Sequence, residues 1–299
     1  MMTAVETKAS RRRIIISGAE AQVSLRRFLG SKEPAVQSDL LRLWKTQAAM
    51  ISEKEIRDMM GSGQAPHDFL VAFERMNADA FNEKICPAAI AGLESAADEI
   101  GRRMKRVLPK SDFLPRIFIQ EFVNQRGASL ITRLNQDMKD AVSNILKQYV
   151  VQEPLGYFQL SRMIRANIGL TEQFSNAVAK RYESLIADGL SADRALADAE
   201  KYAAFLHKVR AMNIARTELA EAYGEGQIQV LRNARDEGLV TAPITKTWAC
   251  ADDERTCAEC SDLDGEQVGL DDEFSSGDDR TPAHCSCRCS IQYEILEEI

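Results

Sequence analysis

Two stretches decide the fold of the C-terminal region: Cys257-Ala258-Glu259-Cys260 and, after twenty-three intervening residues, His284-Cys285-Ser286-Cys287-Arg288-Cys289. Six of the seven cysteines of this 299-residue chain fall within forty residues around them. Near the N-terminus, the apolar run Ile14-Ile15-Ile16 is too short for a secretory signal. Outside the secretory pathway, clustered cysteines are typical of metal sites rather than disulfides. The pattern therefore predicts a bound metal ion.

Zinc in a structural site takes four ligands at tetrahedral corners, and a C-x2-C turn supplies two of them. We predict Cys257, Cys260 and Cys287 as ligands, with either His284 or Cys289 as the fourth. Cys285 also stays a candidate, because residues two apart on an extended segment share a face. Since more ligands are present than four positions require, a closed structural zinc site is favoured over an open hydrolytic one.

Two competing interpretations of the cysteines are a redox pair at Cys257 and Cys260 and a chance cluster of free thiols. A redox pair explains two cysteines and leaves four of the cluster unexplained. We interpret Cys250 as a bystander and Cys86, which lies in a helical context, as a buried small hydrophobe. The zinc interpretation accounts for the most residues.

Three short strands are expected around the cysteines, over residues 240–248, 265–268 and 288–294, with an acidic loop over 271–279. Three strands of this length bury little apolar area. Metal binding contributes on the order of 10 kcal/mol to the folding of small zinc modules. We therefore expect the ion to hold this module together.

The rest of the chain has the composition of a helical protein, rich in Ala, Leu, Glu, Arg and Lys. Ser52 and Glu55 form a capping-box pattern, and Gly189 is placed as the residue that ends a helix. Helices are expected over residues 36–50, 52–61, 66–80, 88–107, 130–149, 161–168, 171–188, 191–208 and 213–235.

These elements predict a mainly α protein, in which a helical body is followed by a small C-terminal zinc-bound α+β module with a short antiparallel sheet. The predicted divisions are a loosely ordered N-terminal arm (1–30), a helical body (31–238) and the zinc-bound module (239–299). No apolar run approaches the ~20 residues that a membrane span needs, so no membrane contact is expected.

Charge is distributed unevenly along the chain. The net charge is −7, yet residues 241–299 carry four basic and fifteen acidic residues, which leaves +4 for residues 1–240. An acidic surface repels nucleic-acid phosphates. Any DNA contact is therefore expected through the helical body and not through the C-terminal module.

The motifs of the C-terminal region resemble the signature of the phage Mu F-like head morphogenesis family. The resemblance rests on Trp248, the Asp252-Asp253 turn, Cys257-x2-Cys260, Leu263-Asp264-Gly265 and Pro282-x-His284-x2-Cys287-Arg288-Cys289, in that order. Upstream, Ile214-Ala215-Arg216-Thr217-Glu218 resembles a helical segment of the same family, so the likeness covers about residues 211–293. Cys285 stands where the family more often has proline.

The resemblance implies a minor head protein of the virion that acts in procapsid assembly at the portal vertex, with host cytoplasm as the place of assembly. The implied partners are the portal protein and capsid or scaffold protein. The role would be structural, with structural Zn²⁺ and no catalytic residues. The alternatives are a zinc-dependent nuclease and a nucleic-acid-binding phage protein, and the acidity of the cysteine region opposes both.

Three further residues receive a specific interpretation. We hypothesise that Arg216 or Glu218 docks the zinc module on the helical body, with Arg216 paired to the Asp252-Asp253 turn; the plain alternative for Arg216 is a surface ion pair. His67 and His207 are interpreted as ordinary helix residues without a catalytic partner.

Overall fold

The computed structural model describes residues 10–104, 114–152, 155–251 and 254–298. Helix dominates, as the composition predicts, and one small antiparallel sheet accompanies it. Before residue 155 the elements are β1 (Ser10–Ile16), α1 (Gly18–Met50), α2 (Glu53–Ser62), α3 (His67–Ala80), the π-helical turn η1 (Phe81–Ile85), α4 (Cys86–Arg103), α6 (Arg116–Leu146) and the π-helical turn η2 (Lys147–Gln152). The later elements are α7 (Tyr157–Asn167), α8 (Glu172–Ala187), α9 (Ala192–Asp236), β2 (Ile244–Ala249), α10 (Ala258–Leu263), β3 (Gln267–Gly269) and β4 (Ser290–Glu298).

The chain divides into two compact units, each assembled from separate segments. Unit 1 consists of residues 1–33, 88–123 and 214–299, and unit 2 of residues 34–87 and 124–213. Both units therefore contain residues from the range 31–238, which the sequence predicts as one helical body. The predicted division of the chain into an arm, a helical body and a zinc-bound module, with boundaries after residues 30 and 238, stays a prediction. The two compact units have different boundaries.

Unit 2 is built from helices around one apolar core. Phe73 and Tyr149 are among its largest fully buried side chains, and the ring of Phe69 lies 4.3 Å from that of Phe73. The predicted capping box at the start of α2 is confirmed, because Ser52 accepts from the backbone N–H of Glu55 and the Glu55 carboxylate accepts from that of Ser52. Local capping and the buried apolar faces of the helices both contribute to the structure of this unit.

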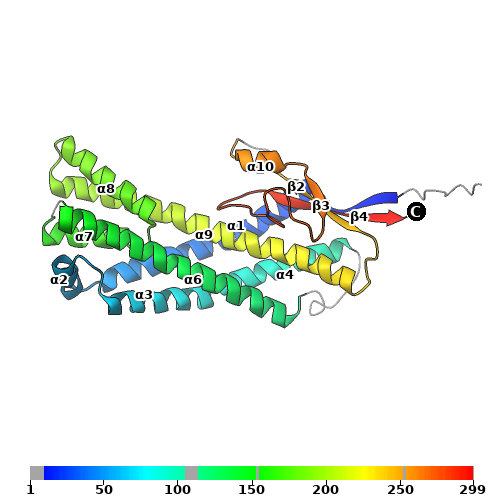
Figure 1. The fold of residues 1–299 in the computed structure, drawn as a ribbon, viewed down its shortest axis with the longest axis horizontal. Helices are drawn as coiled ribbons and strands as arrows, with labels where there is room; N and C mark the ends of the chain where they lie inside the picture. The colour runs from blue at the N-terminus through cyan, green and yellow to red at the C-terminus, as the bar shows by residue number, and fades with distance from the viewer. Residues whose placement is uncertain (1–9, 105–113, 153–154, 252–253, 299) are drawn as a thin grey trace, which may run out of the picture. The chain divides into compact units, whose positions relative to one another are not determined.

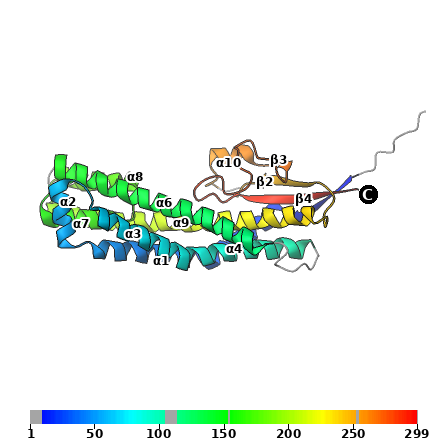
Figure 2. The ribbon, with the colours of Figure 1, turned by 60° about the horizontal axis from the view of Figure 1, so that its bottom comes forward.

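Unit 1 contains a four-stranded antiparallel sheet in the order β1-β4-β2-β3. The C-terminal part of α9 covers one face of the sheet, and α10 lies on the other side (Figures 1 and 2). Trp248 of β2 and Tyr293 of β4 share a buried apolar cluster with Leu93 of α4 and Leu231 of α9. Packing against these helices gives the sheet the core that its short strands lack alone.

Helices α4 and α9 approach each other closely at Gly226. A Cβ atom at this position would lie 2.5 Å from the carbonyl oxygen of Leu93 and 3.0 Å from the Cβ of Ala96. Only glycine leaves room for the backbone of α4 at this point. The close approach fixes the part of α9 that carries the sheet.

Several sequence expectations differ from the structure. Residues 10–16, expected in a loosely ordered arm, form edge strand β1, because the β-branched run after Arg13 pairs with β4 and buries Ile16. The helix expected from residue 36 begins at Gly18 and contains Pro34. The helices expected over 191–208 and 213–235 are one helix, α9, because no glycine or proline separates them. Helix α4 ends at Arg103. Residues 105–107, which the sequence predicts as part of this helix, lie outside the described residues.

The three strands expected around the cysteines are present with shifted bounds, as β2, β3 and β4. The sheet is larger than expected because the N-terminal segment supplies its fourth strand. It also rests on the helices of unit 1, so a metal ion is not its sole support.

Candidate metal centre

Three local structures carry the cysteines toward one another. Cys257 is the N-cap of α10, and its Sγ accepts from the backbone N–H of Cys260 at 3.4 Å, which makes the C-x2-C segment a tight turn. A second turn is closed by the N–H of Cys287, which donates to the carbonyl oxygen of His284 at 3.1 Å. β4 then begins directly after Cys289. The side chains of two segments distant in the sequence thus come into contact.

The first group of potential ligands consists of Cys257, Cys260 and His284, whose ligand atoms all lie within 4.8 Å of one another. The Nε2 atom of His284 is 3.1 Å from each of the two Sγ atoms. The Nδ1 atom lies 3.0 Å from the carbonyl oxygen of Cys285, which only accepts, so Nδ1 carries the proton in neutral imidazole. The lone pair of Nε2 then faces the thiols, as a zinc ligand requires.

The second group consists of Cys260, Cys287 and Cys289, all buried and again within 4.8 Å of one another. Cys260 belongs to both groups. Tetrahedral zinc with Zn–S bonds of about 2.3 Å separates two sulfurs by about 3.8 Å. The Sγ atoms of Cys260 and Cys287 are 3.7 Å apart, which fits this separation. The structure therefore places the five predicted ligand residues in two groups of three that share Cys260.

The remaining two cysteines of the cluster occupy different positions. Cys285 is exposed and belongs to neither group; its Sγ lies 3.7 Å from Thr217 Oγ1. Cys250, interpreted as a bystander, is buried beside the site, with its Sγ 3.6 Å from that of Cys289. The Cys250 thiol donates to the carbonyl oxygen of Cys260 at 2.6 Å. This bond ties the end of β2 to the C-x2-C turn.

Burial makes the thiols poor acids without a cation. It raises the pKa of Cys260 to about 12 and that of Cys250 to about 11. The pKa of Cys287 is raised above its ordinary value, first by its hydrogen bond with Cys289 and then by burial. Several adjacent thiolates are stable in such a place only beside a positive charge, and a divalent ion supplies it. Sulfur and imidazole donors fit zinc.

The Leu263-Asp264-Gly265 turn holds α10 against the sheet. The Asp264 carboxylate accepts from the backbone N–H of Cys250 at 2.8 Å, and the N–H of Gly265 donates to the carbonyl oxygen of Trp248 at 2.9 Å. Gly265 has a φ of +82°, which glycine adopts without strain. The turn therefore sets the position of the first ligand pair relative to β2.

The acidic loop that follows β3 is attached to α9 by ion pairs that sequence reasoning missed. Arg232 pairs with Asp271 at 2.9 Å and with Asp279 at 3.4 Å, and Arg235 also pairs with Asp271. The basic residues of the last turns of α9 thus offset part of the loop's negative charge. Arg232 and Arg235 are three residues apart and so share one face of the helix, and this spacing could have indicated a basic surface for the acidic loop.

Arg280 makes the most buried of these connections. Its guanidinium pairs with Glu221 at 2.8 Å and Glu225 at 2.6 Å on α9, and with Asp279 at 2.6 Å. Burial raises the pKa of Glu225, and the charge of Arg280 opposes that shift. Directly after Arg280, the carbonyl oxygen of Thr281 lies 2.5 Å from where a Cβ of Gly224 would be. The chain leading to His284 is therefore pressed against α9.

The Arg216-Thr217-Glu218 segment docks this region through its middle residue. Arg216 pairs with Glu33 at 3.0 Å, while Asp252 and Asp253 lie outside the described residues. The backbone N–H of Ser286 donates to Thr217 Oγ1 at 3.0 Å. Ser286 has a φ of +60°, so this contact holds a left-handed residue between two candidate ligands. Glu218 is buried.

The other candidate sites have a structural character. His67 and His207 both lie in helices, as expected. His207 Nε2 is 2.7 Å from the carbonyl oxygen of Ile168, and burial lowers the pKa of His207.

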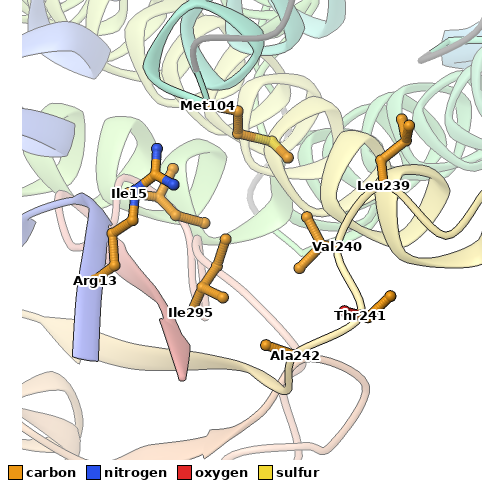
Figure 3. A pocket seen from close by; sticks show the side chains of 8 residues that line it. All are labelled: Arg13, Ile15, Met104, Leu239, Val240, Thr241, Ala242 and Ile295. Carbon is orange, nitrogen blue, oxygen red and sulfur yellow. The ribbon is translucent and has the colours of Figure 1, made fainter. Parts of the chain in front are cut away.

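A small cavity of about 140 Å³ in unit 1 is lined by β1, β4, the end of α4 and the segment after α9 (Figure 3). Its lining is mainly aliphatic, with Arg13 as the charged residue.

The fold and the site together define a class of protein. It is mainly helical and carries a segment with cysteine and histidine side chains beside a small sheet. Residues 176–292 match the family model described as Phage Mu protein F like protein. This region runs from within α8 into β4 and includes the whole cysteine cluster. This region of the chain is similar to the phage Mu F-like family, in agreement with the motifs of residues 211–293.

A curated relative shows a similar likeness over part of the chain. Minor head protein GP7 of Bacillus phage SPP1 is 26% identical over 165 residues. The alignment covers 51% of this chain and 50% of that protein, so the chain spans about half the length of the relative that it matches. No solved structure gives a significant match. Among the described residues, none of the helices has the length and apolar character to cross a membrane.

Proposed function

We propose that this chain is a structural minor head protein of a tailed phage, which acts in procapsid assembly and head morphogenesis at the portal vertex. The match of residues 176–292 to the phage Mu F-like family carries the proposal. The name of its relative, a minor head protein, agrees with it. The protein would then be part of the virion, with the portal protein and capsid or scaffold protein as partners.

The metal site has a structural role in this proposal. We assign Cys257, Cys260, His284 and Cys287 as the zinc ligands, with Cys289 as the competitor of Cys287 for the fourth position. The 3.7 Å separation of the Cys260 and Cys287 sulfurs supports this choice. Cys289 has the Cys250 thiol as a second neighbour at 3.6 Å. Four protein ligands close the coordination shell of the ion, which is typical of structural rather than catalytic zinc.

Zinc bound in this way would connect the C-x2-C turn to the segment that enters β4. That segment is already docked on α9 by Thr217 and Arg280. The ion would therefore fix the loops of unit 1 to its helices and sheet, and present a rigid surface for assembly. The net charge of −11 over residues 241–299 speaks against a phosphate substrate, and thus against the nuclease alternative.

Co-expression with the portal protein of the same phage tests the proposed role. We expect the wild-type chain to co-migrate with the portal protein in size-exclusion chromatography. Cys260→Ser should lose the complex, whereas Cys285→Ser should retain it, because Cys285 belongs to neither ligand group. Absence of the wild-type chain from the portal fraction would contradict the partner assignment. Metal-dependent cleavage of linear DNA by the purified chain would contradict the structural role.

A further inference from the structure

A cavity of about 670 Å³ lies in unit 2, in a part of the sequence well before the cysteine cluster. It is lined by residues of α1, α7 and α9. The lining is mainly apolar and includes Leu41, Ala48, Ala166, Ile168 and Ala203. Small alanine side chains on the lining helices leave space that a large apolar side chain would fill.

The rim of this cavity is cationic. Lys45 and Lys208 are at its edge, and Arg162 and Arg165 also line it. Arg162 makes a two-pronged ion pair with Glu200, at 2.8 and 2.5 Å. Among the described residues, no carboxylate forms an ion pair with Lys45 or Lys208. The two lysines therefore leave a positive rim for a ligand to neutralise.

The aromatic residue of the cavity is not arranged for nucleic acid. Trp44 is only 3% exposed, and its ring is covered by the Arg210 guanidinium at 5.4 Å and by the His207 ring at 5.6 Å. A base that stacks on a protein needs an open aromatic face. Trp44 does not offer one. The apolar lining instead favours an aliphatic or aromatic side chain of a protein.

An exposed aromatic residue extends the apolar surface beyond the cavity. Phe158 of α7 is 62% exposed, and Arg162 of the cavity lining lies over its ring at 5.6 Å. An exposed phenylalanine beside an apolar cavity is typical of an interaction surface, because a partner removes both from water. The combined surface has an apolar centre and a charged edge, as protein interfaces do.

We propose that this cavity is a docking site for an acidic segment of a partner protein, which inserts one large apolar side chain and places carboxylates against Lys45 and Lys208. The acidic C-terminal region of a second copy fits less well. Within residues 239–251 and 254–295, whose side chains the structure describes, no large hydrophobic side chain is exposed, so this part of the region offers no apolar anchor. This inference depends on the proposed function in one respect: it assumes that the partner is another head protein.

Two peptide arrays test this proposal with the full-length, fluorescently labelled chain. The first array tiles the other virion proteins of the same phage as 15-residue peptides. The second holds designed peptides with one Leu, Phe or Trp flanked by glutamates, together with versions in which lysine replaces glutamate. A single-stranded dT oligonucleotide is measured in parallel by fluorescence anisotropy.

We expect bound peptides to be acidic with a central apolar residue, and their lysine versions to be unbound. The variant Lys45→Glu/Lys208→Glu should weaken binding by roughly tenfold or more, since it places like charges at the contact. Ala204→Trp, which fills the cavity, should do the same. The matched control Lys54→Glu/Lys147→Glu, with lysines of unit 2 outside the cavity, should bind as wild type.

The outcomes separate this inference from the proposed function. Binding to designed peptides but to none of the virion peptides would support the docking chemistry and contradict a head protein as the partner. Absence of binding on both arrays would overturn the docking site and leave the zinc centre unaffected. Equal binding by the wild type and the Lys45→Glu/Lys208→Glu variant, or preference for the oligonucleotide, would also overturn it.

Discussion

Unit 2 and the cysteine-bearing part of unit 1 are stabilised in different ways. Unit 2 is helical, and one apolar core with Phe73 and Tyr149 extends through it. The segment between β2 and β4 contains only the short α10 and the three-residue β3 as regular elements among its described residues. Apolar side chains such as Leu263 and Phe274 anchor it to the core of unit 1, and ion pairs, hydrogen bonds and thiols supply further contacts.

The difference shows how a loop-rich segment obtains a defined structure. Helices satisfy their own backbone hydrogen bonds and need only a buried face. A long loop must instead be fixed at many points, and here Arg232, Arg280, Thr217 and the thiol cluster are those points. If the two regions depend on these different contacts, a substitution in one region should lower the stability of that region and leave the other region protected.

The largest effect is expected from truncation of buried aromatic residues. Trp248→Ala in unit 1 and Phe73→Ala in unit 2 should each lower the free energy of unfolding by about 3–5 kcal/mol, because both side chains are almost fully buried. Trp248 also contacts Phe274 edge to face, with ring centroids 5.1 Å apart, so its loss should release the acidic loop. Urea unfolding with hydrogen exchange measures both effects.

In the exchange experiment, Trp248→Ala should expose amides of residues 266–279 first, whereas Phe73→Ala should leave them protected. An identical exchange pattern for the two variants would contradict the distinction between the regions.

An intermediate, pH-dependent effect is expected for Arg280→Ala. The variant leaves Glu225 buried without its partner at 2.6 Å, which should cost roughly 2–4 kcal/mol at pH 7. The folded pKa of Glu225 is already above the ordinary 4.5 because of burial, and losing Arg280 raises it further. The folded state then binds the proton more tightly than the unfolded state does. The stability deficit is therefore small below pH 4.5 and grows as the pH rises through the raised pKa.

Chemical unfolding between pH 4 and pH 8 measures this dependence. The exposed residue Arg57, paired with Glu53 on α2, provides the control: Arg57→Ala should change stability by less than about 0.5 kcal/mol at every pH. A deficit for Arg280→Ala that does not change with pH would refute the role given to Glu225.

The smallest effect is expected at Thr217. Thr217→Val removes the hydroxyl that accepts from Ser286 N–H and should cost about 1 kcal/mol, whereas Thr217→Ser retains it. Because Ser286 lies between His284 and Cys287, Thr217→Val should also speed the release of bound metal to a chelator. Arg216→Ala, which loses the pair with Glu33, should leave that rate unchanged. Equal release rates for all variants would remove Thr217 as a docking residue.

The sequence predicts the convergence of the cysteines well, because ligand chemistry requires the C-x2-C turn and the segment of residues 284–289 to meet. It also predicts the helices whose caps are local, such as α2 with Ser52 and Glu55. The choice among Cys285, Cys287 and Cys289 depends on the direction of each side chain. The structure places Cys285 outward through the left-handed turn at Ser286.

The parts that the sequence does not predict are long-range. β1 pairs with β4 across almost the whole chain, and its basic residues suggest a tail when considered alone. The overall charge of residues 241–299 does not reveal that Arg232 and Arg235 of α9 offset the acidic loop. Nor does local patterning show that the two units are built from interleaved segments. Such pairings depend on the tertiary fold and not on periodicity.

Metal content of the folded protein tests the central claim most directly. Protein purified without chelator or affinity tag should contain about one zinc ion per chain by elemental analysis. Cys260→Ser should lose it, because Cys260 belongs to both ligand groups, whereas Cys285→Ser should retain it. A wild-type protein without stoichiometric metal, in which chelator leaves hydrogen exchange over residues 254–289 unchanged, would contradict the claim.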